Sequence, residues 1–406
     1  PEGEKGELTV LGVDMDRTYM DKLKTVLLRP DLLETRKAKV VYTNLHGTGG
    51  VIIVPMLREL GFEVVTVPEQ DGPDGRFPTV ESPNPENAPA LAKGIALAEK
   101  VGADAVIATD PDCDRMGVAI RNDVGEMELL TGNQIGSLLG WYRIKTMFDL
   151  GWITESNRSR AVLVKTLVTT DLQRSIAEKY GISVIDTLTG FKYIGEKLKK
   201  YEDAIPNEKK GDYRNLTEEE SRKLRLEYSK FFVFGGEESY GYLGSDFVRD
   251  KDGNASAVMF AELAAYAMSE GTSIAGLRDR IWGEYGVHME EGKSLVMEGG
   301  EGARKIAALV KSYSVDPPAI VDGSDAIAVR DYERGGFYDQ EGDELPAASM
   351  LFVDLADGRR FAVRPSGTEP KIKYYLFGKG ENKDGVQKSL DALWLALEKD
   401  AYQRMT

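Results

Sequence analysis

The first part of the chain alternates short apolar runs with amphipathic stretches. Apolar runs predict buried strands, and apolar residues spaced three and four positions apart predict helices. Strands are expected at residues 8–15, 39–42, 62–67 and 117–121, and a further strand begins at residue 105. Helices are expected at residues 19–28, 54–60, 86–101 and 132–147. This alternation predicts βαβ units built on a largely parallel sheet.

The alternation begins again after residue 160. Strands are expected at residues 161–168, 183–188 and 231–236, and helices at 171–180, 193–201, 255–269 and 274–285. Between them, residues 202–230 are rich in Lys, Glu and Arg, which predicts an exposed helical insertion.

The pattern changes near residue 286. Strand-like pieces at 294–297, 326–332, 350–355 and 360–363 alternate with turns, and helices are expected at 302–313 and 384–402. We therefore predict an α/β fold of consecutive domains, with a smaller α+β domain at the C-terminus. The expected limits are 1–126 and 127–286 for the α/β domains, the second carrying the helical insertion 202–230, and 287–406 for the α+β domain.

Composition narrows the possible classes of protein. No apolar run among the 406 residues approaches the ~20 needed to cross a membrane, and the N-terminus does not resemble a signal peptide. Cys113 is the only cysteine, so no internal disulfide forms and a cytoplasmic location is expected. The net charge of −15 argues against nucleic-acid and membrane partners. Cations that hold an anionic substrate must therefore be local.

Three carboxylates follow the strand that begins at residue 105. Asp110, Asp112 and Asp114 stand at alternate positions, and such a cluster needs a cation. Oxygen ligands without His or Cys suit Mg²⁺ or Ca²⁺. An EF-hand is excluded because Arg115 and Arg121 stand where Gly and Glu are required. A solvated acidic loop is the alternative. Arg115 favours a metal site beside a phosphate, since both cations could face one anion.

Among the glycine-containing loops, residues 364–373 are the strongest candidate for an anion-binding site. Arg364 can hold a phosphate with two hydrogen bonds, and Gly367 permits close approach of the backbone. Ser366 and Thr368 add hydroxyl groups. An ordinary hairpin with exposed cations is the alternative.

Two further loops and one histidine have weaker signals. Residues 236–239 leave a strand with acceptors and a hydroxyl, which suits sugar hydroxyls, although a surface turn has the same composition. Residues 189–192 are weak evidence alone. His46 lies in a glycine-rich loop after a strand and is interpreted as structural.

Together these loops resemble those of the α-D-phosphohexomutase family, which contains phosphoglucomutases and phosphomannomutases. The resemblance covers the metal-binding loop, the two sugar-selecting loops and the phosphate-binding loop, in family order: residues 109–115, 189–192, 236–241 and 364–373. The segments 77–79, 83–86 and 367–370 are more similar to the subgroup of the family that also includes phosphopentomutases.

The resemblance implies four domains in a heart-shaped arrangement, three α/β units followed by an α+β domain. The family's phosphoryl carrier is a serine followed by His-Asn-Pro in the first domain. This sequence has two histidines, His46 and His288, and neither follows such a serine. We therefore expect the chain to begin at the family's second domain and to show no mutase turnover alone.

The resemblance also implies roles for single residues. Mg²⁺ would be held by the three aspartates, and a sugar 1,6-bisphosphate would be the intermediate. Sugar binding would involve Thr189, Gly190, Glu237 and Ser239. The phosphate that does not react would contact Arg364, Ser366, Gly367, Thr368 and Lys373. The cations facing the reacting phosphate would be Arg115, Lys192 and Lys251.

The predicted activity is Mg²⁺-dependent interconversion of sugar 1-phosphate and 6-phosphate, with glucose or mannose as the sugar. Phosphopentomutase activity is an alternative. Asp14 and Asp16 match the spacing of a haloacid-dehalogenase-type phosphatase, with Asp14 as nucleophile and Asp16 as acid. A non-catalytic sugar-phosphate binder is a third possibility. The expected partner is a phosphorylated sugar, and the expected state is a monomer or weak dimer.

Overall fold

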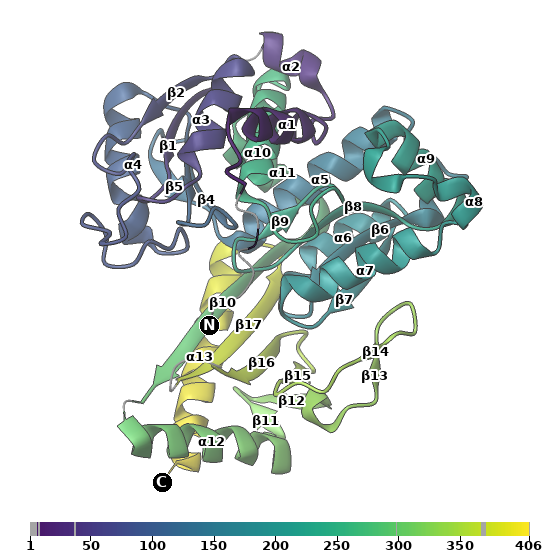
Figure 1. The fold of residues 1–406 in the computed structure, drawn as a ribbon. Coiled ribbons are helices and arrows are strands. Elements are labelled where there is room, and N and C mark those ends of the chain that lie inside the picture. Colours follow the sequence, from purple (N-terminus) through teal and green to yellow (C-terminus); the bar gives the residue numbers. More distant parts are fainter. Residues whose placement is uncertain (1–5, 7–8, 36–37, 298, 367–370, 406) are drawn as a thin grey trace. The chain divides into compact units, whose positions relative to one another are not determined.

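A computed structural model describes residues 6, 9–35, 38–297, 299–366 and 371–405 (Figure 1). The chain forms two compact units. The first contains residues 1–130, 210–223 and 241–274, and the second contains residues 131–209, 224–240 and 275–406. This grouping does not follow chain order, because residues 241–274 pack with the N-terminal part of the chain. The three domain limits given above stay a prediction.

The sheet of the first unit has the strand order β2-β1-β3-β4-β5. Strand β1 (Lys39–Thr43) pairs in parallel with β2 (Glu63–Thr66) and β3 (Ala105–Thr109). Strands β4 (Met116–Arg121) and β5 (Met127–Leu129) are antiparallel. The expected parallel sheet is thus correct for three strands. The loop between β3 and β4 is too short for the crossover that a parallel pair needs.

Helices cover the sheet of the first unit and bury its apolar residues. They are α3 (Gly50–Glu59), α4 (Ala88–Val101) and α10 (Gly253–Ser269), and α2 (Pro30–Thr35) packs on α10. Most of α10 is buried, because its Ala-rich sequence is apolar on nearly every side. It contains one buried carboxylate, Glu262, which accepts hydrogen bonds from the backbone N–H groups of Leu28 (2.8 Å) and Arg29 (2.5 Å).

The strand expected at residues 8–15 is wrong. Residues 9–12 form no strand, and helix α1 (Val13–Lys24) begins within the expected range. Asp14 and Asp16 lie in its first turn, where carboxylates stabilise a helix through its dipole. The alternating apolar residues that suggested a strand, among them Val10 and Val13, are largely exposed.

The second unit begins with a parallel sheet in the order β7-β6-β8. Its strands are β6 (Ala161–Thr166), β7 (Ser183–Thr187) and β8 (Phe231–Gly236), as the apolar runs predict. The surrounding helices are α5 (Gly132–Asp149), α6 (Leu172–Lys179), α7 (Phe191–Asp203) and α11 (Ile274–Tyr285). In the described part of the chain, no helix is long and apolar enough to cross a membrane.

The insertion at residues 202–230 is helical, as expected. It contains α8 (Asn207–Lys210), a 3-10 turn (Tyr213–Asn215) and α9 (Glu218–Tyr228). It is not a purely solvated face, because the side chains of Tyr213 and Arg225 are buried. The remaining short strand of the first unit is β9 (Tyr242–Leu243).

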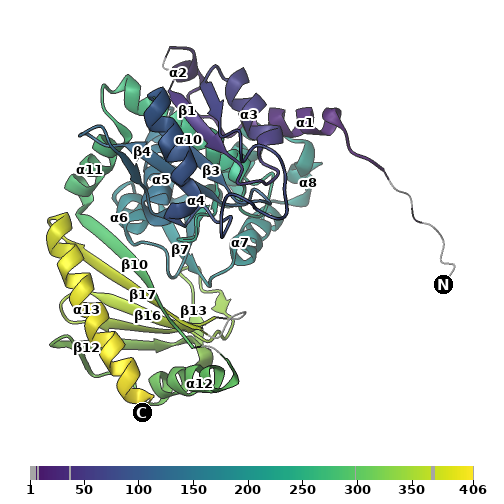
Figure 2. The same ribbon diagram turned by 90° about the vertical axis from the view of Figure 1, so that its left-hand side faces the viewer.

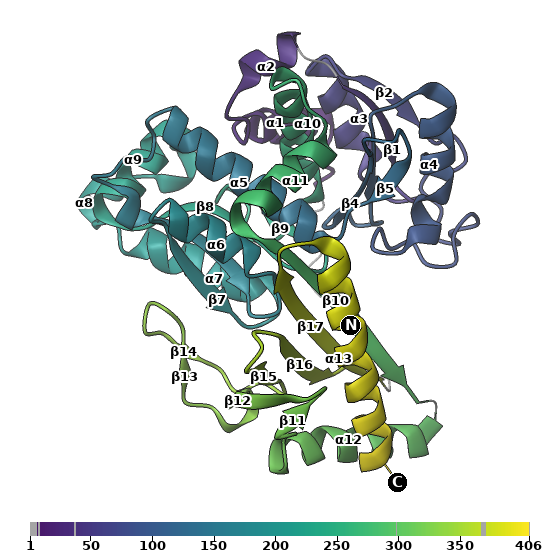
Figure 3. The same ribbon diagram turned by 180° about the vertical axis from the view of Figure 1, so that it is seen from behind.

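The C-terminal part of the second unit is an antiparallel sheet in the order β10-β17-β16-β15-β12-β11. Its strands are β10 (Val287–Val296), β11 (Ile320–Val321), β12 (Ser324–Asp331), β15 (Leu351–Leu355), β16 (Arg360–Pro365) and β17 (Lys371–Gly380). Helices α12 (Gly299–Val315) and α13 (Lys383–Arg404) pack on it, and α13 lies along β10 and β17 (Figure 2). A hairpin of β13 (Phe337–Tyr338) and β14 (Glu344–Leu345) extends from the sheet (Figure 3).

Strand β17 is missing from the sequence prediction, which assigned its first residues to the phosphate-binding loop. Its pattern is that of a half-buried strand, with Ile372, Tyr374 and Leu376 buried and Lys373 exposed between them. The described ends of that loop therefore belong to a β-hairpin of β16 and β17.

Replacing Glu262 by alanine should destabilise the protein. The change removes the acceptor of two backbone N–H groups, and a buried group that loses its acceptor costs about 1–3 kcal/mol. We expect the free energy of unfolding in urea to fall by about 2–5 kcal/mol. Glu99→Ala is the control, because Glu99 is exposed on α4 and its loss should change the value by under about 0.5 kcal/mol. An equal effect of the two substitutions would contradict the capping role.

Candidate functional site

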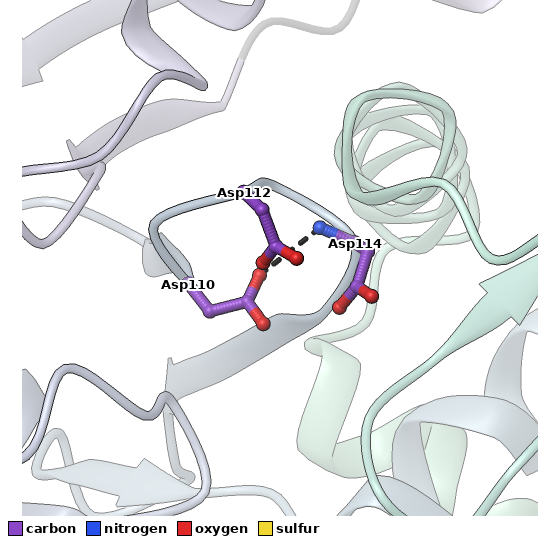
Figure 4. A group of neighbouring side chains, drawn as sticks. All are labelled: Asp110, Asp112 and Asp114. Carbon is purple, nitrogen blue, oxygen red and sulfur yellow. Dashed lines mark hydrogen bonds between the residues drawn. The ribbon is translucent and has the colours of Figure 1, made fainter.

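The acidic loop, residues 110–115, directly follows the buried strand β3 in the first unit. The carboxylates of Asp110, Asp112 and Asp114 each place an oxygen within 4.8 Å of the others (Figure 4). Asp110 is buried, Asp114 is half-buried and Asp112 is exposed. The structure thus brings the three predicted metal ligands together, and their binding of a metal stays a prediction.

One oxygen of Asp110 shapes the loop itself. Asp110 Oδ1 accepts a hydrogen bond of 3.0 Å from the backbone N–H of Asp114 (Figure 4). It accepts a second hydrogen bond of 3.0 Å from the backbone N–H of Arg115. Burial, followed by the neighbouring carboxylates of Asp114 and Asp112, raises the pKa of Asp110. Asp114 Oδ1 is buried and accepts no hydrogen bond from the described residues. A buried carboxylate oxygen without a donor is suited to a cation.

Two of the predicted cations contact this cluster. Lys251 Nζ lies 2.5 Å from Asp114 Oδ2. Arg115 Nη1 lies 3.0 Å from Glu86 Oε1, and Arg115 Nε lies 3.7 Å from carboxylate oxygens of Asp110 and Asp114. The structure thus brings Arg115 and Lys251 to the aspartates. The sequence prediction missed Glu86, which follows a Pro-rich turn far from the acidic loop in the chain.

The two expected sugar loops meet in the second unit. Glu237 follows β8 and is buried, and its Oε1 accepts a hydrogen bond of 2.8 Å from the backbone N–H of Gly190, which follows β7. Gly190 has φ 119°, a backbone conformation that favours glycine. Because β7, β6 and β8 are parallel, the loops at their carboxyl ends share one edge of the sheet. Ligands of open α/β sheets bind at such an edge.

The other residues of these loops have different surroundings. Ser239 and Thr189 are half-buried, whereas Lys192 is exposed and its ammonium lies 4.7 Å from the ring centre of Tyr193. Tyr240 has φ 66°, which is strained for a residue with a side chain. Helix α5 approaches this loop closely, because a Cβ at Gly132 would lie 2.0 Å from the carbonyl oxygen of Glu238.

The sequence prediction missed the carboxyl end of β6 and the loop that follows it, residues 166–170. Thr166 Oγ1 donates to Glu238 Oε2 at 3.3 Å, which ties this loop to the Glu237 loop. The signal that could have found it is topological, since β6 is the central strand and its carboxyl end lies between the other two.

The Arg364 hairpin, formed by β16 and β17, places two cations side by side. Arg364 lies directly opposite Lys373 in the antiparallel register, so both side chains are on one face. Neither forms an ion pair with a carboxylate among the described residues. Ser366 is half-buried and its backbone N–H donates to the carbonyl of Lys371 at 2.9 Å. The predicted ligands Gly367 and Thr368 lie outside the described residues.

Three domain descriptions of one family match the chain. Phosphoglucomutase/phosphomannomutase α/β/α domain II matches residues 17–125, α/β/α domain III matches residues 131–285, and the C-terminal domain matches residues 303–385. The predicted fold class, consecutive α/β domains followed by a C-terminal domain, is confirmed.

Curated relatives have the same family character. The phosphoglucomutase of Staphylococcus aureus (strain USA300) is 33% identical over 361 residues, which are 87% of this chain and 59% of that protein. The phosphopentomutase of Homo sapiens is 32% identical over 410 residues, which are 96% of this chain and 62% of that protein. The chain therefore spans about three fifths of the length of these relatives.

Solved structures share the fold. The open form of the phosphoprotein pp63/parafusin, a phosphoglucomutase from Paramecium, has a TM-score of 0.65 at 17% identity and covers 96% of this chain and 62% of its own. A phosphoglucomutase/phosphomannomutase family protein from Burkholderia thailandensis has a TM-score of 0.59 at 17% identity. The match covers 96% of this chain and 65% of that protein. With three consecutive domains matched in order, this chain belongs to the phosphoglucomutase/phosphomannomutase family.

Proposed function

We propose that this chain carries the metal-, sugar- and phosphate-binding residues of a Mg²⁺-dependent mutase that interconverts a sugar 1-phosphate and 6-phosphate. The observation that carries the proposal is the acidic loop, in which three carboxylates converge and one buried oxygen of Asp114 accepts no hydrogen bond from the described residues. Family membership supports the reaction class.

The residues present fit Mg²⁺. The donor set consists of carboxylate oxygens alone, which Mg²⁺ prefers. Asp110, Asp112 and Asp114 would hold the ion, which when bound would neutralise charge on the transferring phosphoryl group. Arg115 and Lys251, both in contact with the aspartates, would face the same phosphate.

The second unit carries the residues that would bind the sugar. Glu237 and Ser239, with Thr189 and Gly190, would contact sugar hydroxyls. Oε1 of Glu237 accepts the backbone N–H of Gly190, so this carboxylate joins the two loops at the place where the sugar would bind. Lys192, exposed at the start of α7, would add positive charge.

The phosphate that does not react would lie at the Arg364 hairpin. Paired cations on neighbouring strands suit a dianion, and Arg364 can donate two parallel hydrogen bonds. Ser366 and Lys373 would complete the contacts together with Gly367 and Thr368. The net charge of −15 makes such a local cationic pair necessary for binding an anionic sugar.

A pentose phosphate is the second candidate substrate. The phosphopentomutase of Homo sapiens aligns with 96% of this chain, at an identity close to that of the phosphoglucomutase. A phosphatase that uses Asp14 is not supported, because Asp14 lies in the first turn of α1 and does not follow a strand.

Asp112→Asn should weaken Mg²⁺ binding by about tenfold or more, because a charged ligand is replaced by a neutral one of nearly equal size. Titration calorimetry with Mg²⁺ measures the change. Asp14→Asn is the matched control and should leave the affinity unaltered, since Asp14 is exposed on α1. Equal affinities for wild type and Asp112→Asn would contradict the metal assignment.

Arg364→Ala should weaken the binding of glucose 6-phosphate by about 10–100-fold. Hydrogen bonds to charged groups contribute roughly 1.5–3 kcal/mol, and each 1.4 kcal/mol is a factor of ten. Arg76→Ala serves as the control, because Arg76 is a highly exposed arginine whose carboxylate partner is its near neighbour Asp74. If the two variants bind glucose 6-phosphate alike, the hairpin is not the phosphate site.

The chain of residues 1–406 should show no mutase turnover, because it contains no serine followed by His-Asn-Pro. The measurement is a coupled assay of glucose 1-phosphate to glucose 6-phosphate with glucose 1,6-bisphosphate supplied. Turnover at ordinary enzyme rates, ~1–10³ s⁻¹, would place the phosphoryl carrier within these residues. The same assay with a pentose 1-phosphate, on a chain that contains the carrier, separates the two substrate classes.

A further inference from the structure

The glycine loop, residues 44–50, has a strained backbone beside the acidic loop. It follows strand β1, the parallel neighbour of β3. Leu45 and His46 have φ values of 46° and 64°, a conformation that residues with side chains adopt at a cost of about 1–3 kcal/mol each. Two such residues in succession persist only where their surroundings hold them.

Hydrogen bonds between the glycine loop and residues 70–79 stabilise this conformation. His46 Nε2 lies 2.8 Å from Thr79 Oγ1, and the backbone N–H of His46 donates to the carbonyl of Gln70 at 3.1 Å. Asn44 Nδ2 donates to the carbonyls of Gly47 (2.7 Å) and Asp71 (3.1 Å). The glycine loop is therefore a rigid element, and its strain is offset by contacts outside it.

The glycine loop contacts the acidic loop at Pro111, the residue between Asp110 and Asp112. The backbone N–H and the hydroxyl of Thr48 both donate to the carbonyl of Pro111, at 2.9 and 3.0 Å. A Cβ at Gly47 would lie 2.3 Å from Pro111 Cα, so only glycine allows this approach. Gly47 does not have a positive φ, and its requirement is purely one of space.

Cys113, the residue between Asp112 and Asp114, is held in the same way by a residue from the C-terminal side of the acidic loop. The backbone N–H of Gly253 donates to the carbonyl of Cys113 at 2.9 Å, and a Cβ at Gly253 would lie 2.7 Å from that oxygen. Asp252 before it accepts a hydrogen bond of 2.6 Å from Tyr19, which fixes the start of α10. The residues that alternate with the three aspartates are thus each tethered through their carbonyl.

We propose that Gly47, Thr48 and Gly253 are positioning residues for the three metal-binding aspartates. They act through the carbonyls of Pro111 and Cys113, and so set the directions in which the intervening carboxylates point. Mg²⁺ demands near-octahedral geometry, so a small displacement of the spacers reduces affinity. This inference rests on the proposed metal site.

The test compares alanine substitutions that differ in the space available. Gly47→Ala and Gly253→Ala force the acidic loop to move. Gly50→Ala is the control within the same loop, because the nearest atom to its Cβ lies 3.5 Å away. Gly94→Ala is the control for a steric clash elsewhere in the core. Its Cβ would lie 2.8 Å from the Val106 side chain and would contact neither the glycine loop nor the acidic loop.

Binding of Mn²⁺, followed by the electron paramagnetic resonance signal of the free ion, is the first readout. We expect Gly47→Ala and Gly253→Ala to lose about 10–100-fold in Mn²⁺ affinity and both controls to stay within about twofold of wild type. Thr48→Val, which keeps the fold by retaining its backbone hydrogen bond, should lose a few-fold, and Thr48→Ser should restore the affinity.

The second readout needs no metal. Cys113 is the only cysteine of the chain and is buried, so its rate of reaction with a disulfide reagent reports the position of the acidic loop. Gly47→Ala and Gly253→Ala should react about tenfold faster than Gly50→Ala and Gly94→Ala. If all four variants match wild type in thiol rate, the proposed anchoring is wrong. Faster thiol reaction together with no Mn²⁺ binding by wild type would refute the metal site and leave the anchoring intact.

Discussion

Mutual repulsion of three carboxylates at the end of one strand is the constraint that organises the first unit. A buried carboxylate close to two others is destabilised as an anion, and burial accordingly raises the pKa of Asp110. The loop offsets this by giving Asp110 two backbone N–H donors, and by bringing Lys251 and Arg115 to the cluster. These contacts come from β3, its own turn and the start of α10, so the unit must close around the loop for the cluster to exist.

The second unit keeps its carboxylate-bearing loops and its paired cations on separate elements, in a chain whose net charge is −15. Parallel strands bring the loops after β7, β6 and β8 to one edge, and Glu237 joins two of them through the backbone of Gly190. The cations are separate from these acceptors. Arg364 and Lys373 face one another across an antiparallel pair, where strand register keeps them together despite their mutual repulsion. Such a pair creates a local positive field that the net charge of the chain does not reveal.

Sequence reasoning succeeded where local pattern and tertiary environment agree. Strands such as β3 and β8 are buried along their whole length, and a continuous apolar run predicts them directly. It failed at the first helix, where alternating apolar residues between 8 and 15 imitate a strand although carboxylates favour the helix start. It also failed at β17, because Lys371–Gly380 begins inside a motif that composition alone interprets as a loop. In both cases the deciding factor was whether a partner strand was available.

The chemical nature of the candidate ligands follows from the sequence alone, since three carboxylates two residues apart and a cation-rich turn are local features. The sequence also determined most helices and strands, because their periodicity is local. What holds these candidate ligands in place depends on contacts between distant parts of the chain. Thr48 is 63 residues from Pro111, and Gly253 is still farther along the chain from Cys113. Their contacts depend on the order of parallel strands and on the absence of a single Cβ, and the distance between backbones that meet across a fold is not encoded in any local pattern.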